Sequence, residues 1–264
     1  MAKISNAQRE QYTQRIKFYQ NVIDGILKKE QSILVEIEKR PDEAALKRFM
    51  LSEVMLNLTS NYIVQSGVSV AFFKIKNENA LNEGRKAVFR SLIYLEDIVT
   101  GWVDAPYSDY EDKVEKLDPV KPEVRYALVK KLGLTIQLLE NAYGDNSKWK
   151  WSFVDMEGRF AAVTKNIFDL KNMVANTDPR SPVYETTVYF LRTVKRLLSQ
   201  SADRYREKYE LSSHRSDDFK AAINFLNALR RIQLLQGATA EAETVKKKAD
   251  AWLAKLDADE KKQS

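Results

Sequence analysis

Cysteine is absent from this chain of 264 residues, and histidine occurs once, as His214. Without cysteine there are no disulfides, thiolate nucleophiles or iron–sulfur clusters, and a single histidine cannot supply the ligands of the usual zinc or di-iron sites. His214 lies in the polar stretch 212–216, where water is its natural partner. We therefore expect no catalytic role for His214.

Glycine and proline are scarce, with 8 and 6 residues. Because strand-rich sandwiches and barrels depend on these residues at their turns, the composition excludes such folds. None of the glycines precedes a lysine, and no two of them are two residues apart. Phosphate loops, dinucleotide fingerprints and serine nucleophile elbows are therefore absent. The sequence predicts no enzymatic activity and no cofactor.

Long hydrophobic runs are also missing. The most apolar stretch, 62–73, contains Gln65, Ser66 and Ser69 and is far shorter than a bilayer span. The first ten residues are polar and lack the apolar core of a signal peptide. We expect a cytoplasmic protein that does not insert into membranes.

What the sequence does contain is apolar residues spaced alternately three and four apart, which is the pattern of amphipathic helices. The first run follows Ser5, which forms a capping box with Gln8, and it stops before Pro41, because proline disfavours helical geometry at the preceding residue. The sequence predicts an all-α fold of eight or nine helices, several of them long, arranged as an elongated multi-helix bundle or as stacked antiparallel helical hairpins. The further runs lie at about 46–62, 80–99, 122–143, 149–174, 184–209, 219–235 and 239–259.

Parts of these runs allow two interpretations. β-branched residues are frequent in 64–75, so a strand is the alternative there to the helix that we favour. Glu30 interrupts the apolar seam of the first helix, either as a buried acid with a raised pKa or as a polar residue that sets the helix register, and the second role is the commoner one. Asp145, Asn146 and Ser147 supply N-cap chemistry for the helix that follows them.

Residues 101–121 form the one long connection, an acidic and aromatic stretch interrupted by prolines. Loops of this length in compact domains usually carry function or join two units. We therefore take it as the link between an N-terminal half, 1–100, and a C-terminal half, 122–264, with one continuous domain as the alternative. Its carboxylates lack the glycine and the regular spacing of a calcium-binding EF-hand, so a solvated acidic loop is the simpler interpretation. These carboxylates belong to Asp104, Asp109, Glu111, Asp112 and Glu115.

The aromatic residues of this connection are candidates for a surface that binds another protein. Trp102, Tyr107 and Tyr110 lie in a segment that is too polar to form core. Large aromatic residues outside a core commonly anchor interfaces. We expect all three to contribute to such a surface.

Trp151 is a fourth candidate for the partner surface. It lies about 200° around its helix from Trp149, and therefore faces away from the apolar seam to which Trp149 belongs. The alternative is a second layer of the same fold, because Gly158 and Ala162 on this face leave room for another helix to approach.

The net charge is +6, and residues 148–231 hold 16 basic and 10 acidic side chains, whereas the rest of the chain is balanced. Such an excess attracts nucleic acid or another polyanion. Four cations share one sector of the helix predicted at 184–209, but acidic residues project into the same sector and would repel phosphate. Nucleic-acid binding is therefore the less favoured interpretation. The four cations are Arg192, Lys195, Arg196 and Arg206.

The prediction of function follows by exclusion. A helical protein with long seams, candidate surface aromatics and no catalytic constellation is most often a scaffold or adaptor for other proteins. We expect a non-enzymatic scaffold or adaptor that mediates protein–protein interaction, with self-association left open. Binding of nucleic acid or another polyanion through 148–231 is the alternative, and an enzyme with an unrecognised site is the third.

Overall fold

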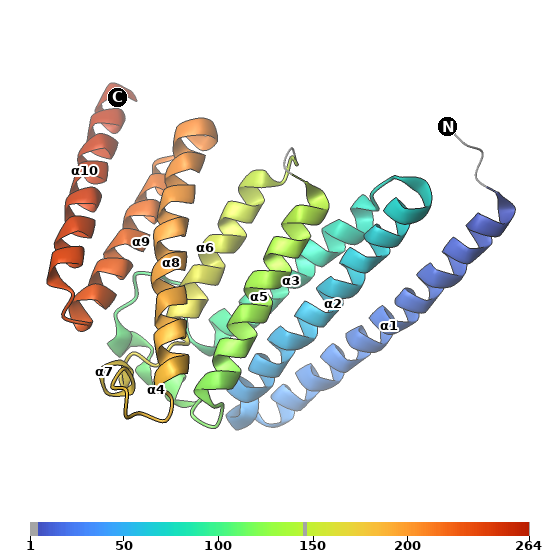
Figure 1. Ribbon diagram of the computed structural model, residues 1–264, viewed down its shortest axis with the longest axis horizontal. Helices are drawn as coiled ribbons and strands as arrows, with labels where there is room; N and C mark the ends of the chain where they lie inside the picture. The colour runs from blue at the N-terminus through green and yellow to red at the C-terminus, as the bar shows by residue number, and fades with distance from the viewer. Residues whose placement is uncertain (1–4, 145–146, 264) are drawn as a thin grey trace. The chain divides into compact units, whose positions relative to one another are not determined.

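The computed structural model describes residues 5–144 and 147–263 (Figure 1). Helix accounts for 83% of the structure, and the described residues form no strand. Within this part of the chain there are ten α-helices, of which eight have 17 residues or more and two have 5 and 4 residues. The all-α prediction is confirmed, because the long apolar runs form the long helices.

The first helix begins and ends where its sequence signals predict. The Oγ atom of Ser5 accepts the N–H of Gln8 at 3.2 Å, while Oε1 of Gln8 accepts the N–H of Ser5 at 3.1 Å. Pro41 begins a short 3-10 turn that leads into the second helix. The long helices are α1 (Asn6–Lys39), α2 (Ala44–Phe73), α3 (Glu78–Ile98), α5 (Pro122–Tyr143), α6 (Lys150–Asn166), α8 (Tyr184–Lys208), α9 (Ser216–Leu235) and α10 (Thr239–Gln263), and the short ones are α4 (Glu111–Glu115) and α7 (Met173–Asn176).

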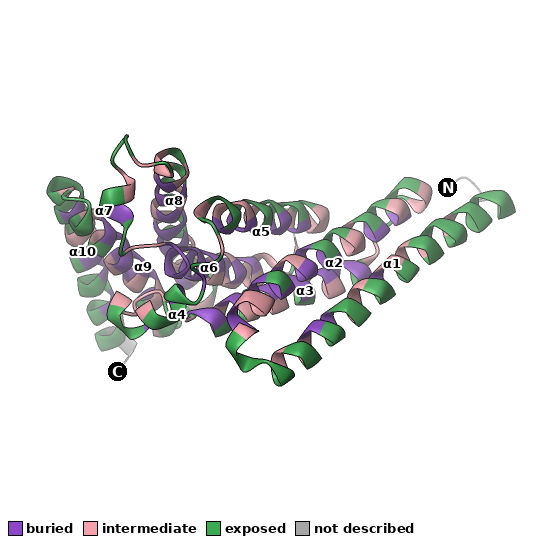
Figure 2. Cartoon of the chain, turned by 90° about the horizontal axis from the view of Figure 1, so that it is seen from below, coloured by how far each residue is buried: buried purple, intermediate pink, exposed green. Residues whose placement is uncertain are grey.

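Residues 1–98 and 128–149 form one compact unit. In this unit α3 packs along α2, and α2 packs along α1 (Figure 1). Leu51, Met55 and Leu58 of α2 are completely buried at the centre of its core. α1 covers this core with one face and leaves most of its surface exposed (Figure 2).

Glu30 is the polar residue within the seam of α1, and it is 1% exposed. Its Oε2 atom accepts a hydrogen bond from Nη1 of Arg90 at 2.7 Å, and its Oε1 atom accepts one from the hydroxyl of Tyr94 at 2.7 Å. Both partners lie on α3. A one-turn slip of α1 would bury this carboxylate without its partners, so the contact fixes the register of α1 against α3.

The segment 64–75 is helical as far as Phe73, which confirms the interpretation favoured above. α2 ends at Lys74, whose backbone is left-handed with φ 57° and whose N–H donates to the carbonyl of Val70 at 2.9 Å. The buried hydroxyl of Ser66 accepts the N–H of Asn77 at 3.1 Å and so fixes the turn into α3.

Residues 99–127 and 150–264 form the second compact unit. In it α8 packs against both α6 and α9, and α9 packs against α10. All residues of 161–168 on α6 and just beyond it are buried, so α6 is a central element of this unit (Figure 2). The space that Gly158 leaves on α6 is filled by α8, because a Cβ atom at this position would lie 2.4 Å from the ring of Tyr205.

The bounds of α6 differ from the run predicted at 149–174. Trp149 precedes the helix and is only half-buried, with the guanidinium of Arg85 stacked 4.0 Å from its ring centroid. The helix stops at Asn166, and Val174 lies exposed on the separate α7. Of the predicted cap, Ser147 accepts the N–H of Trp149 at 3.1 Å, and Asp145 and Asn146 lie outside the described residues.

The two units divide the chain differently from the halves 1–100 and 122–264 that we expected. Residues 128–149, which include most of α5, belong to the first unit. The connection 101–121 is part of the second unit, where it forms a 3-10 turn, Tyr107–Asp109, and the short α4. Among the described residues, no helix is both long and apolar enough to cross a bilayer.

Candidate functional site

A loop formed by residues 100–105, here called the 100–105 loop, is held by two buried polar residues at the end of α6. Lys165 is the first of them. Its Nζ atom donates hydrogen bonds to the carbonyl of Val103 at 3.0 Å and to the carbonyl of Ala105 at 3.2 Å. The same ammonium group lies 5.2 Å from the centre of the Tyr110 ring. Lys165 therefore ties the second half of the loop to the core.

Burial lowers the pKa of Lys165 to about 8. The nearby guanidinium of Arg231 also lowers it, and the carboxylate of Asp104 opposes the shift. A lysine with a lowered pKa is a common feature of active sites. Here the amine is occupied by two backbone carbonyls, so the contacts indicate a structural role.

Asn166 is the second residue that holds the loop. Its Nδ2 atom donates to the carbonyl of Thr100 at 2.8 Å and to the carbonyl of Trp102 at 3.2 Å. The N–H of Trp102 donates to Oγ1 of Thr100 at 3.2 Å. Arg231 of α9 adds a third attachment. Its guanidinium pairs with the carboxylate of Asp104 and donates to the backbone carbonyl of the same residue at 3.0 Å.

Trp102 lies within this fixed loop, and the residue is 79% exposed. Both polar groups of its backbone are hydrogen-bonded, which limits the directions that the side chain can take. The structure thus presents a large aromatic side chain to the solvent from an ordered backbone. This agrees with the exposure that the sequence predicts for Trp102.

The prediction of a surface position is wrong for Tyr110, which is 1% exposed. The chain folds back after the 3-10 turn and places the Tyr110 ring beneath the loop, against the ammonium group of Lys165. Burial raises the pKa of the Tyr110 hydroxyl. Tyr107 is half-buried and meets the Tyr110 ring edge-on, with 5.4 Å between the centroids. Tyr110 therefore supports the loop from within, and Tyr107 packs against Tyr110.

Trp151 is half-buried, and Nζ of Lys150 lies 4.7 Å from the centre of its ring. It is at the beginning of α6, whereas Asn166, which holds Trp102, is at the end. Fifteen residues of helix separate the two positions by about 22 Å. Trp151 and Trp102 are therefore not neighbours, and a partner that contacts both would have to span most of the length of α6.

Three of the five acidic residues of the connection are engaged with basic partners. Glu111 and Glu115 both pair with Nζ of Lys171, at 3.1 and 2.9 Å, and Asp104 pairs with Arg231. Over residues 5–144 and 147–263, no group of three or more acidic or histidine side chains is arranged to hold a metal ion.

The predicted cation stripe lies on α8, with Arg192 and Arg196 exposed and Lys195 and Arg206 half-buried. Arg206 pairs with Glu210 at 3.0 Å, as expected for a helical pair four residues apart, and its guanidinium covers the ring of Trp252. The other three cations form no ion pair with a described residue. The stripe is therefore partly neutralised.

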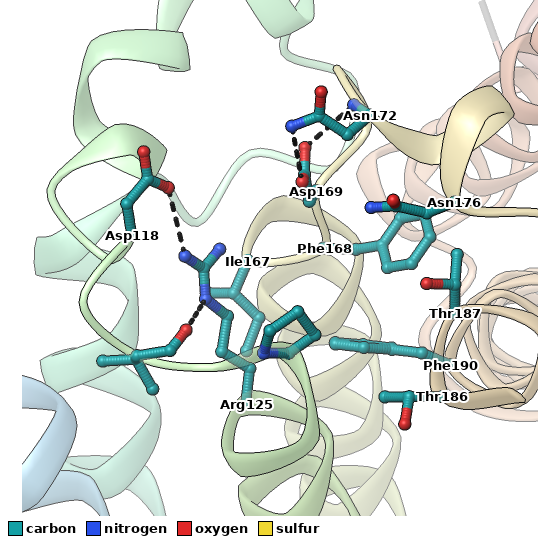
Figure 3. Close-up of a pocket in the computed structure, with 12 residues that line it drawn as sticks. Asp118, Arg125, Ile167, Phe168, Asp169, Asn172, Asn176, Thr186, Thr187 and Phe190 are labelled. Carbon is teal, nitrogen blue, oxygen red and sulfur yellow. Dashed lines mark hydrogen bonds and ion pairs between the residues drawn. The ribbon is translucent and has the colours of Figure 1, made fainter. Parts of the chain in front are cut away.

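The second unit also contains a pocket of about 200 Å³ that the sequence did not reveal (Figure 3). Arg125 lies at one side of it and is 5% exposed. Its Nε atom donates to the carbonyl of Val120 at 3.0 Å, and Nη2 donates to Oδ1 of Asp118 at 3.3 Å. Burial lowers the pKa of Arg125, and Asp118 and then Asp169 oppose the shift.

Sequence reasoning missed Lys165, Asn166 and Arg125, although a signal for each was present. All three are polar residues that interrupt strongly apolar runs, as Glu30 does. Such positions are buried by the helix around them, and a buried polar group needs a partner. The sequence shows the interruption but not the loop or pocket that supplies the partner.

These features describe an all-α protein with an ordered loop that displays a tryptophan and with a small buried-arginine pocket. The chain belongs to the TP0443 family, whose family model matches residues 8–260. The comparison with curated proteins found no match. The comparison with solved structures also found none.

Proposed function

We propose that this protein is a non-enzymatic helical scaffold or adaptor that binds another protein through Trp102. The proposal depends on one observation, which is that Trp102 is 79% exposed while its backbone is held by Thr100 and Asn166. An exposed tryptophan on an ordered backbone has the properties of an interface anchor.

The ordered backbone matters for the energetics of binding. A flexible loop loses conformational entropy when it binds, and that loss reduces affinity. The attachments from Lys165, Asn166 and Arg231 impose this order during folding, before any partner arrives. Burial of the indole against a partner then contributes to affinity with little further ordering.

The contacts that hold the loop also separate its structural role from its binding role. Lys165 and Asn166 bond to backbone carbonyls, and neither contact involves the indole ring. Replacement of the indole therefore removes the proposed anchor and leaves the attachments of the loop in place.

The test is cross-linked affinity capture from the native cell, with the bound proteins identified by mass spectrometry. Wild-type protein, Trp102→Ala and Tyr189→Ala are compared, because Tyr189 is another exposed aromatic residue of the second unit. We expect a partner that is recovered with the wild type and Tyr189→Ala and is depleted with Trp102→Ala. Identical recovery with all three proteins would contradict the proposal.

Binding of a polyanion through the α8 stripe is the second candidate. It is favoured by Arg192, Lys195 and Arg196, which form no ion pair with a described residue. Retention on immobilised DNA or RNA near physiological salt, falling steeply as salt rises, would support it. Because Arg206 is paired and acidic residues intervene, we expect weak retention.

A further inference from the structure

The pocket of the second unit is a candidate ligand site that is separate from the 100–105 loop. Its walls come from the segment 118–125 at the beginning of α5, the segment after α6, the short α7 and the beginning of α8 (Figure 3). Its volume is about 200 Å³, and drug-sized ligands usually occupy about 300–1,000 Å³. The pocket is therefore suited to a molecule smaller than a drug.

Arg125 supplies a buried positive charge that its protein partners satisfy only in part. Nε and Nη2 have the partners given above, whereas Nη1 has no hydrogen-bond partner among the described residues. Asp118, the only described carboxylate bonded to this guanidinium, is largely exposed and makes a single bond of 3.3 Å. A carboxylate ligand would engage the remaining donors of the guanidinium.

Two helix N-termini reinforce the preference for a negative group. Pro122 and Arg125 lie in the first turn of α5, and Thr186 and Thr187 lie in the first turn of α8. The first turn of a helix carries partial positive charge, although the N–H groups of Arg125 and Thr187 already donate to the carbonyls of Lys121 and Val183. The hydroxyls of the two threonines make no hydrogen bond to a described residue, so they are also available to a ligand.

The carboxylate of Asp169 disfavours a ligand that carries only negative charge. Its Oδ1 atom accepts the backbone N–H of Asn172 at 3.0 Å and its Oδ2 atom accepts Nδ2 of Asn172 at 2.9 Å, which holds the carboxylate in the pocket lining. This negative charge would repel phosphate or sulfate. It would attract a ligand that carries an ammonium group beside its carboxylate.

Apart from Asn172 and Asn176, the remaining wall is apolar. Ile167, Phe168 and Phe190 line the pocket, and the rings of Phe168 and Phe190 pack edge-on with 5.0 Å between their centroids (Figure 3). These side chains are suited to an aliphatic or aromatic group of the ligand.

We propose that this pocket binds a free α-amino acid with an apolar side chain, with its carboxylate on Arg125 and its ammonium group near Asp169. Isothermal titration with L-leucine and L-phenylalanine tests the proposal on the full chain. L-leucinamide lacks the carboxylate and 4-methylpentanoate lacks the ammonium group, and we expect each to bind at least tenfold more weakly than L-leucine. The proposal is wrong if either analogue binds as tightly as L-leucine, or if inorganic phosphate binds more tightly than L-leucine. It is also wrong if neither amino acid saturates the protein up to about 10 mM, which would correspond to a very weak affinity.

Variants of pocket residues test whether L-leucine binds in this pocket. Asp169→Asn keeps the shape of the side chain and its acceptor for the Asn172 N–H. We expect this variant to bind L-leucine at least tenfold more weakly than the wild type does. Thr187→Val tests the contribution of α8 without removing a charge. We expect it to reduce the affinity for L-leucine less than Asp169→Asn does. Trp102→Ala is the control and should leave L-leucine binding unchanged. If Asp169→Asn has a wild-type circular dichroism spectrum and binds L-leucine as well as the wild type does, the assignment is wrong.

Discussion

At the residue scale, Trp102 and Phe160 represent the two situations in which an aromatic side chain occurs in this protein. Phe160 is buried in α6, and its replacement by alanine removes a large apolar group from a packed core. Trp102 contacts the solvent, and its replacement removes little from the fold. The free energy of unfolding therefore separates the two roles.

We predict that Phe160→Ala lowers the free energy of unfolding by about 3–5 kcal/mol, and that Trp102→Ala changes it by less than about 0.5 kcal/mol. Urea titration followed by circular dichroism measures both values. A loss for Trp102→Ala as large as that for Phe160→Ala would show that the indole is part of the core.

Lys165 makes stability depend on pH in a defined direction. Its pKa is about 8 in the folded protein and about 10.4 in an unfolded chain. Between pH 8 and 10 the unfolded chain therefore binds more protons at this residue, so the free energy of unfolding should rise with pH through this window. Above about pH 10, tyrosines with pKa values raised by burial, such as Tyr110 and Tyr205, oppose the rise, because they ionise more readily in the unfolded chain.

The measurement is the free energy of unfolding at four values from pH 7 to pH 10, for the wild type and for Lys165→Met. The variant loses the ammonium group and should be less stable at every pH, but it should lack the part of the rise that Lys165 causes. Equal slopes for the two proteins would contradict the shifted pKa.

At the element scale, the close approach of α6 and α8 depends on Gly158. A Cβ atom there would lie 2.4 Å from Cε2 and 2.8 Å from Oη of Tyr205, whose ring is also stacked on Phe225. A displacement of the ring would disturb that stack. The glycine therefore sets the distance between the two helices.

We predict that Gly158→Ala destabilises the protein by roughly 1–3 kcal/mol, because the added methyl overpacks the contact. Gly67→Ala is the matched control, since Gly67 is also helical and a Cβ atom there would meet nothing within 4 Å. That variant should be stabilised by about 0.5–1 kcal/mol. Thermal unfolding compares the two, and shifts of the same sign would refute this account.

The sequence predicts elements better than it predicts their ends and their neighbours. Periodicity locates the eight long helices because each buries one apolar face, and local signals at Ser5 and Pro41 locate the bounds of α1. Periodicity fails at the end of α6, because Ile167 continues the apolar pattern although the helix stops at Asn166. The polarity of the segment 101–121 also misplaces Tyr110, because a ring in a polar segment is buried only when a distant element such as α6 receives it.

At the scale of the whole molecule, the basic segment 148–231 and the candidate sites lie in the same unit. Residues 148–231, with their excess of basic side chains, lie almost entirely in the second unit, which also holds the 100–105 loop and the pocket. The sequence predicts this excess and the exposed Trp102. It does not predict the pocket, because the lining residues come from four separate segments of the chain.

The central claim is that Trp102 anchors a protein partner from an ordered loop. The most direct test is the dissociation constant of the captured partner, measured for the wild type and for Trp102→Ala under the same conditions. We predict that the variant binds at least about 30-fold more weakly, which corresponds to about 2 kcal/mol, while its thermal unfolding is unchanged. Equal dissociation constants for the two proteins would contradict the claim.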